Sequence, residues 1–182
     1  MSTIPALLDL ARKVRKERMA AMTDVFAAEG YGEEEAKKAA RAALKVGVKK
    51  AEEHNGYICT LQQEVHRPLS AMLRERFAHS GGWQHHSGEY WLGMGEIVTA
   101  ILQPSFDKLI KGYRKQRKQS APALFPDEQL SVFSLVNEGR DGITFLVWNK
   151  QEEPECWRYS GTQEQRFANL SLFLDWFNEH ER

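Results

Sequence analysis

The residue types best suited to metal binding fall in one short stretch of the chain. His79 is followed by the pair His85-His86 and then by Glu89. Imidazole nitrogens and carboxylate oxygens are common ligands of zinc and related metals. However, two adjacent histidines in an extended segment point in opposite directions and do not readily meet at one ion. The spacing therefore favours a polar loop after a helix, and a small metal-dependent enzyme using the His79–His86 loop stays the second alternative.

Other catalytic side chains occur without the patterns that catalysis requires. Cys59 and Cys156 are far apart, so they form no metal-ligand spacing or disulfide framework, and Cys156 alternates with Trp157 as a buried strand residue would. No nucleophile elbow, phosphate loop or dinucleotide fingerprint is present. The carboxylate pair Glu152-Glu153 falls in a polar turn. The sequence predicts no enzyme, no catalytic residue, no metal site and no cofactor.

Charge is balanced over the whole chain but is not evenly spread. The sequence has 25 basic and 25 acidic residues, yet residues 124–182 have five basic and eleven acidic residues, a net charge of −6. Much of the opposite excess lies in Lys108–Lys118. A single basic stripe in a neutral protein is a weak signal for nucleic acid, and we expect neither a nucleic-acid nor a membrane partner. The stripe is able to pair with the acidic half, within one molecule or between copies.

Aromatic residues are also frequent in the acidic segment, residues 124–182. Alternation along a strand places Trp148 on the opposite face from Ile143, Phe145 and Val147, and one face of an antiparallel sheet is often left uncovered. An exposed tryptophan with an acidic rim is typical of a protein-binding hot spot. The predicted partner-binding residues are Glu138, Asp141, Trp148, Glu152, Glu153, Glu155 and Trp157.

The first part of the chain predicts two antiparallel helices. Apolar residues recur at helical spacing from Pro5 to Glu29, and Gly30-Tyr31-Gly32 interrupts the pattern. A second helix is predicted from about Glu33 to Glu53, with small residues on one stripe. We expect residues 1–56 to form a helical hairpin that precedes the domain of residues 57–182. This hairpin either packs as scaffold or contacts a partner, and its charged segment at residues 12–18 favours contact.

The middle of the chain predicts further helices and one short strand. Residues 57–65 favour a helix, and Pro68 starts another that ends at Ser80-Gly81-Gly82. Tyr90-Trp91-Leu92 follows as a strand. A helix then begins near Gly93 and is interrupted at Pro104.

The last part changes to the two-residue period of β-structure. Three strands are predicted over Ser131–Val136, Ile143–Trp148 and Glu155–Tyr159. A closing amphipathic helix presents Leu170, Phe173, Leu174 and Phe177 on one face, with Asn169 or Ser171 as its cap. The fold class is therefore α+β, an antiparallel sheet flanked by helices and preceded by a helical hairpin.

No apolar run is long enough to cross a bilayer, and Arg12–Lys16 follows the first apolar stretch instead of preceding it as a secretory signal requires. We expect a cytoplasmic protein.

The order of these motifs resembles the SUKH superfamily, which includes yeast cell-wall-synthesis regulators and bacterial toxin-immunity proteins. The similarity runs from about residue 65 to the end. The motifs that carry it are Arg67-Pro68-Leu69, Ser80-Gly81-Gly82, Leu92-Gly93-Met94-Gly95-Glu96-Ile97, Leu124-Phe125-Pro126, Gly139–Trp148 and the segment from Phe167 to Leu174. The first sixty residues and the length of the Lys108–Lys118 stretch depart from the family pattern.

The resemblance implies an immunity protein that binds and neutralises a cognate bacterial toxin by direct contact, covering its active site or substrate channel. A regulatory or scaffold protein that binds a cellular partner is the first alternative. The identity of the toxin, the contacting face and the oligomeric state are left open by the sequence.

Overall fold

The computed structural model describes residues 3–44, 47–53, 55–85, 87–149 and 152–180. Their main feature is a seven-stranded antiparallel sheet with strand order β1-β4-β5-β6-β7-β8-β9. Strands β2 and β3 pair separately as a small ribbon. The strands are β1 (Gly47–Val48), β2 (Tyr57–Cys59), β3 (His66–Pro68), β4 (Trp83–Gln84), β5 (Glu89–Trp91), β6 (Leu130–Val136), β7 (Gly142–Val147), β8 (Glu155–Ser160) and β9 (Gln163–Phe167).

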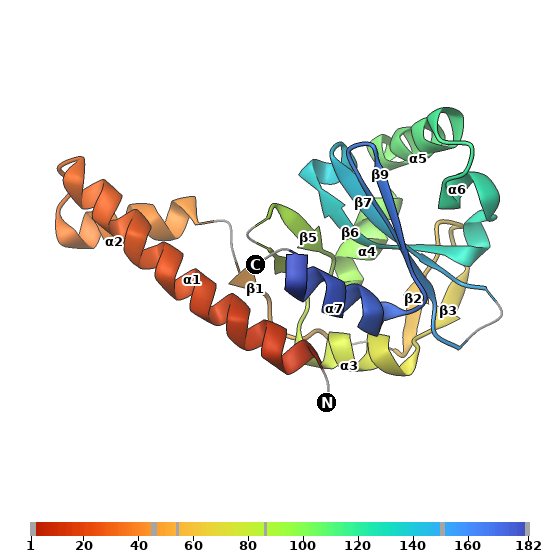
Figure 1. Cartoon of the computed structure of the whole chain (residues 1–182), viewed down its shortest axis with the longest axis horizontal. Coiled ribbons are helices and arrows are strands. Elements are labelled where there is room, and N and C mark those ends of the chain that lie inside the picture. Colours follow the sequence, from red (N-terminus) through yellow and green to blue (C-terminus); the bar gives the residue numbers. More distant parts are fainter. Residues whose placement is uncertain (1–2, 45–46, 54, 86, 150–151, 181–182) are drawn as a thin grey trace.

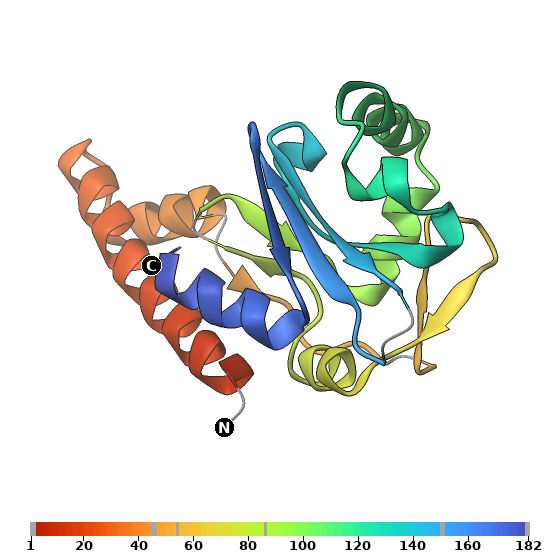
Figure 2. The same cartoon turned by 45° about the vertical axis from the view of Figure 1, so that its right-hand side comes forward.

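Helices lie on both faces of this sheet (Figure 1, Figure 2). One face carries α7 (Leu170–His180), with α3 (Ala71–His79) and the start of α1 (Thr3–Ala28) beside it. The other face carries α4 (Met94–Ile101), α5 (Pro104–Gln116) and the short α6 (Ala121–Leu124). The α+β class and the helical pair before the sheet are thus confirmed.

Aromatic side chains fill the space on each side of the central strands. Trp91 contacts Phe133, Phe173 and Phe177 below α7, with ring centroids 4.9–5.9 Å apart. On the other side, Tyr113 of α5 meets Tyr159 of β8 at 5.6 Å. Rings at these distances add to the burial of apolar area. Both faces of the sheet are therefore core.

The two N-terminal helices form an arm that extends beyond the sheet (Figure 1). Ile4, Leu7 and Leu8 at the start of α1 are buried in the main core. The rest of α1 runs outward alongside α2 (Glu33–Ala43), which begins with three glutamates, as the helix dipole favours. We call residues 11–44 the arm and the sheet with its covering helices the body.

Three local predictions from the sequence are wrong. The second helix ends at Ala43 and not near Glu53, and β1 follows it and pairs with β4. Residues 57–59 form strand β2 and not a helix. The helix expected at Pro68 begins at Ala71, because the Ser70 side chain caps it by accepting the Leu73 N–H.

The remaining helices agree more closely with their sequence signals. Pro104 begins α5, as a residue without an N–H is suited to do. Asn169 Oδ1 accepts the Leu172 N–H and is the expected cap of α7. Cys156 is fully buried within β8.

Candidate functional site

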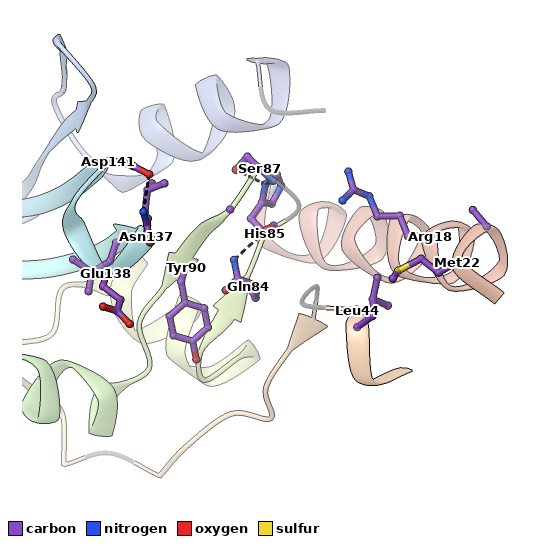
Figure 3. Close-up of a pocket in the computed structure, with 15 residues that line it drawn as sticks. Arg18, Met22, Leu44, Gln84, His85, Ser87, Tyr90, Asn137, Glu138 and Asp141 are labelled. Carbon is purple, nitrogen blue, oxygen red and sulfur yellow. Dashed lines mark hydrogen bonds between the residues drawn. The ribbon is translucent and has the colours of Figure 1, made fainter. Parts of the chain in front are cut away.

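A notch separates the arm from one edge of the body (Figure 3). It encloses about 970 Å³. Arg18 and Met22 of α1 and Leu44 after α2 form the arm side, while the body side comes from the β4–β5 turn and the β6–β7 turn. The notch residues are Arg18, Ala21, Met22, Ala43, Leu44, Gln84, His85, Ser87, Gly88, Tyr90, Leu135, Val136, Asn137, Glu138 and Asp141.

The β6–β7 turn has an unusual backbone at this notch. Asn137 and Glu138 have φ of 47° and 56°, and Gly139 follows at 87°. Left-handed conformations cost energy in residues other than glycine, so a run of three needs support from its surroundings. The Asn137 amide donates to Asp141 Oδ2 at 3.0 Å across the turn. The Glu138 side chain is 86% exposed, and its Oε2 lies 3.8 Å from Nη2 of Arg140, which is also exposed.

Gly139 fixes this turn against α5. A β-carbon at Gly139 would lie 2.4 Å from Leu109 Cδ2, so a larger residue requires the Leu109 side chain to move, and the φ of 87° adds backbone strain. The turn is therefore set by packing as well as by its own hydrogen bonds.

A second hollow continues the notch along the body. It encloses about 610 Å³ between α4, α5 and the β6–β7 turn, and it shares Leu135 and Glu138 with the notch. Its walls include Ala100, Phe106 and Lys108. Glu138 and the apolar Leu135 thus lie where the two hollows meet.

Near the notch, the side chains of Lys49, Tyr90 and Glu96 form a hydrogen-bonded cluster. This cluster connects the segment after β1 with the start of α4. Lys49 Nζ and the Tyr90 hydroxyl both donate to Glu96 Oε1 at 2.5 Å, and the Gly93 N–H donates to Oε2 at 2.8 Å. Burial alone would raise the pKa of Glu96, but these hydrogen bonds outweigh it and lower the pKa. Burial, and next the bond to Glu96, raises the pKa of Tyr90. Both shifts move the groups away from exchanging protons at neutral pH.

His85 lies in the notch wall with a packing role. Its ring meets Phe177 edge-on at 4.4 Å, and its Nδ1 lies 3.1 Å from Ser87 Oγ. His79 lines a different hollow, beside Lys49 and Lys50, and His86 lies outside the described residues. Among the residues that the structure describes, no group of three or more histidine, cysteine or acidic side chains is arranged to hold a metal.

The predicted partner-binding residues fall into two separate groups. Glu138 and Asp141 line the notch before β7, whereas Glu152, Glu153 and Glu155 follow its other end. The six residues of β7 span roughly 17 Å, so the expected single acidic rim is divided.

Two of the glutamates after β7 are also engaged within the molecule. Glu153 Oε1 accepts the Met72 N–H at the start of α3. Glu155 accepts hydrogen bonds from Asn149 and from Trp157 Nε1. Glu152 is the exposed member of this group, whereas Glu153 and Glu155 are half-buried.

The expectation of an exposed tryptophan is wrong. Trp148 is 6% exposed and Trp157 is 4% exposed. Trp148 Nε1 donates to Ser131 Oγ at 3.0 Å, and Trp157 packs against Phe125 with Arg166 lying over its ring. The prediction assumed that one face of the sheet is open to solvent. Helices cover both faces, and the alternating pattern of a strand does not indicate whether its second face is also covered.

The basic stripe on α5 is largely satisfied inside the molecule. Lys111 pairs with Asp107 at 2.6 Å, and Arg114 pairs with Asp127. Arg117 donates to the Gly161 carbonyl. The suggested pairing between this stripe and the acidic residues of 124–182 is thus observed within one copy for one ion pair, Arg114 with Asp127.

Sequence reasoning missed the arm side of the site. Arg18 and Met22 of α1 and Leu44 after α2 lie about a hundred residues of sequence away from the β6–β7 turn on the opposite wall of the notch, and no local pattern encodes that proximity. The one usable signal was the unusual charge of residues 12–18.

Comparison of this chain with family models, with curated proteins and with solved structures returned no match. Within the described residues, no helix is both long and apolar enough to cross a membrane.

Proposed function

We propose that this chain is a SUKH-type immunity protein that binds a cognate bacterial toxin and neutralises it by direct contact, with the notch and its acidic turn as the contact surface. The notch lies at the surface between the arm and the body and encloses about 970 Å³. A hollow of this size is large enough to receive a segment of another protein. The resemblance of residues 65–182 supplies the class of partner.

The observation that carries the proposal is the presentation of Glu138. Glu138 lines both hollows together with apolar Leu135, on a turn whose Gly139 approaches Leu109 of α5. Charged groups held rigidly beside apolar surface add specificity and speed encounter with a complementary partner. Toxins that act on nucleic acids or nucleotides carry basic clefts, and an acidic turn is complementary to such a cleft.

The hydrogen bonds at Glu96 favour a binding role over proton-transfer catalysis. Glu96 is held in its charged form and Tyr90 in its neutral form, each by a partner of the same cluster. Such groups join elements of the fold more readily than they exchange protons.

The test is co-expression with the product of the neighbouring toxin gene, followed by co-purification. The wild-type chain is expected to form a stable complex and to protect cells. The double variant Glu138→Lys/Asp141→Lys is expected to weaken the complex by about 100-fold or more, since two attractive charges become repulsive.

Glu152→Lys is the matched control, because it reverses another exposed acidic residue after the other end of β7. It is expected to leave binding close to the wild-type value. A complex that Glu152→Lys disrupts while the double variant leaves it intact would place the interface elsewhere. Absence of any complex with the neighbouring product would contradict the immunity function.

A further inference from the structure

The arm lacks the buried core that normally stabilises packed helices. From Ala11 to Ala28 no residue of α1 is buried, and Ala36 and Ala40 are the buried residues of α2. Val25 and Tyr31 near the tip are 56% and 47% exposed. Most of the stability of a helix in a protein comes from packing an apolar face, so these two helices still have surface left to pack.

A groove runs between the two helices on a face other than the notch face. It encloses about 620 Å³ and shares no residue with the notch. Met19, Ala20 and Thr23 provide an apolar centre. We call this the arm groove, and its basic rim consists of Arg12, Arg15, Lys16, Lys37 and Arg41.

The rim charges are only partly compensated. Arg12 pairs with Asp9, and Lys37 pairs with Glu33 and Glu34. Arg15, Lys16 and Arg41 make no ion pair with any residue that the structure describes. Asp24 is the single carboxylate among the described residues lining the arm groove. The cations without such a partner, Arg15, Lys16 and Arg41, therefore leave a positive excess beside an apolar strip.

The spacing of the cations matches one kind of occupant. Arg12 and Lys16 stand one helical turn apart on one wall, and Lys37 and Arg41 do the same on the other. Carboxylates one turn apart on a bound helix repeat at about 6 Å and are able to meet such rows. Guanidinium groups bind carboxylates well because both are planar.

Other occupants fit these features less well. A second copy of the chain could dock groove against groove across a two-fold axis. The two basic rims would then face each other, and their like charges would oppose association. A nucleic acid would satisfy the cations but would leave the apolar centre unused.

We propose that the arm groove binds an acidic amphipathic helix of a partner protein, with apolar side chains on Met19 and Ala20 and carboxylates facing the basic rim. This helix-in-groove contact would give the arm the third helix that its packing lacks. The inference is independent of the function proposed above, since it concerns a different face of the arm.

The experiment measures fluorescence anisotropy with the full chain and a labelled peptide of about 14 leucine and glutamate residues, four turns in helical order. A peptide with the same composition but scrambled order separates amphipathic docking from simple charge attraction. The wild-type chain is expected to bind the ordered peptide at least about ten-fold more tightly than the scrambled one.

Charge reversal then locates the site. Arg15→Glu/Lys16→Glu on α1, and separately Arg41→Glu on α2, are each expected to weaken binding about ten-fold or more. Arg18→Glu reverses a single charge, as Arg41→Glu does, but on the notch face of α1, and it is expected to leave peptide binding nearly unchanged. Far-ultraviolet circular dichroism checks that each variant keeps its helices.

Four results would overturn the inference. Equal affinity for the two peptides would reduce it to charge attraction, and loss of binding in Arg18→Glu alone would move the contact to the notch. Tighter binding of a DNA duplex, lost in Arg15→Glu/Lys16→Glu, would identify a nucleic-acid surface. A wild-type dimer that Arg41→Glu dissociates would assign the groove to a second copy.

Discussion

At the scale of single residues, an ion pair buried inside the sheet connects four strands. Arg158 Nε donates to Glu89 Oε2 at 3.1 Å, and Ser134 Oγ donates to Glu89 Oε1 at 2.5 Å. Gln165 accepts from Arg158, whose guanidinium also lies over the Trp176 ring. Both charged side chains are at most 9% exposed. Such a pair adds specificity to the register of β5, β6, β8 and β9, while its loss leaves a buried charge poorly compensated.

Glu89→Ala is therefore expected to lower the free energy of unfolding by about 3–5 kcal/mol, because the Arg158 charge loses its principal counter-charge in a buried site. The measurement is urea denaturation followed by tryptophan fluorescence. Glu128→Ala removes an exposed carboxylate on the same body and is expected to change stability by less than about 0.5 kcal/mol. Equal effects of the two variants would refute the structural role of the pair.

The lowered pKa of Glu96 makes a prediction about pH. A carboxyl group whose pKa is lower in the folded state stabilises the fold above its ordinary value of 4.5, and this contribution is lost as pH falls through the folded-state pKa. The difference in unfolding free energy between wild type and Glu96→Gln should therefore be largest at neutral pH and should shrink under acid conditions. Lys49→Met should reduce that pH dependence, since Lys49 is a principal partner. A difference that stays constant with pH would contradict the described hydrogen bonds.

At the scale of elements, the β6–β7 turn offers a matched pair of glycines. Gly139 and Gly161 both have positive φ, but a β-carbon at Gly139 meets Leu109 whereas nothing lies within 4 Å at Gly161. Gly161→Ala is expected to cost about 1 kcal/mol of backbone strain. Gly139→Ala should cost more than this, because the Leu109 side chain must also move away from the new β-carbon. Thermal denaturation measures both, and equal losses would mean that Leu109 does not fix the turn.

The sequence predicted the elements whose periodicity is strong. The meander β6–β8 and α7 have alternating or helical apolar patterns and were found within a residue or two of their bounds. Strand β9 was missed because Gln163–Phe167 is mostly polar and exposed at a sheet edge. Strands β1 and β4 have two residues each, too few to show a period.

The early end of α2 shows a different reason why a prediction from sequence fails. Its small-residue pattern continues past Ala43, and the helix stops because Gly47 and Val48 gain partners in β4. A contact between distant segments thus overrides local helix preference. The same reasoning applies to Trp148, whose burial depends on a cover that its own strand does not encode.

At the scale of the whole molecule, the arm and the body together create the candidate site. The sequence predicted Glu138 and Asp141 as binding residues from their acidic character. The notch that they line also depends on the direction in which α1 extends from the body. The sequence specifies that α1 is long and charged, and it does not specify the surface that its outer half faces. Tertiary placement of this kind is beyond any periodicity argument.

The most direct measurement of the central claim is photo-crosslinking of the toxin complex from defined positions on this chain. A benzophenone amino acid at Met22 lies in the notch, and one at the exposed Leu124 on α6 lies outside it. The account predicts a covalent adduct with the toxin from position 22 and none from position 124. An adduct from position 124 without one from position 22 would contradict binding through the notch.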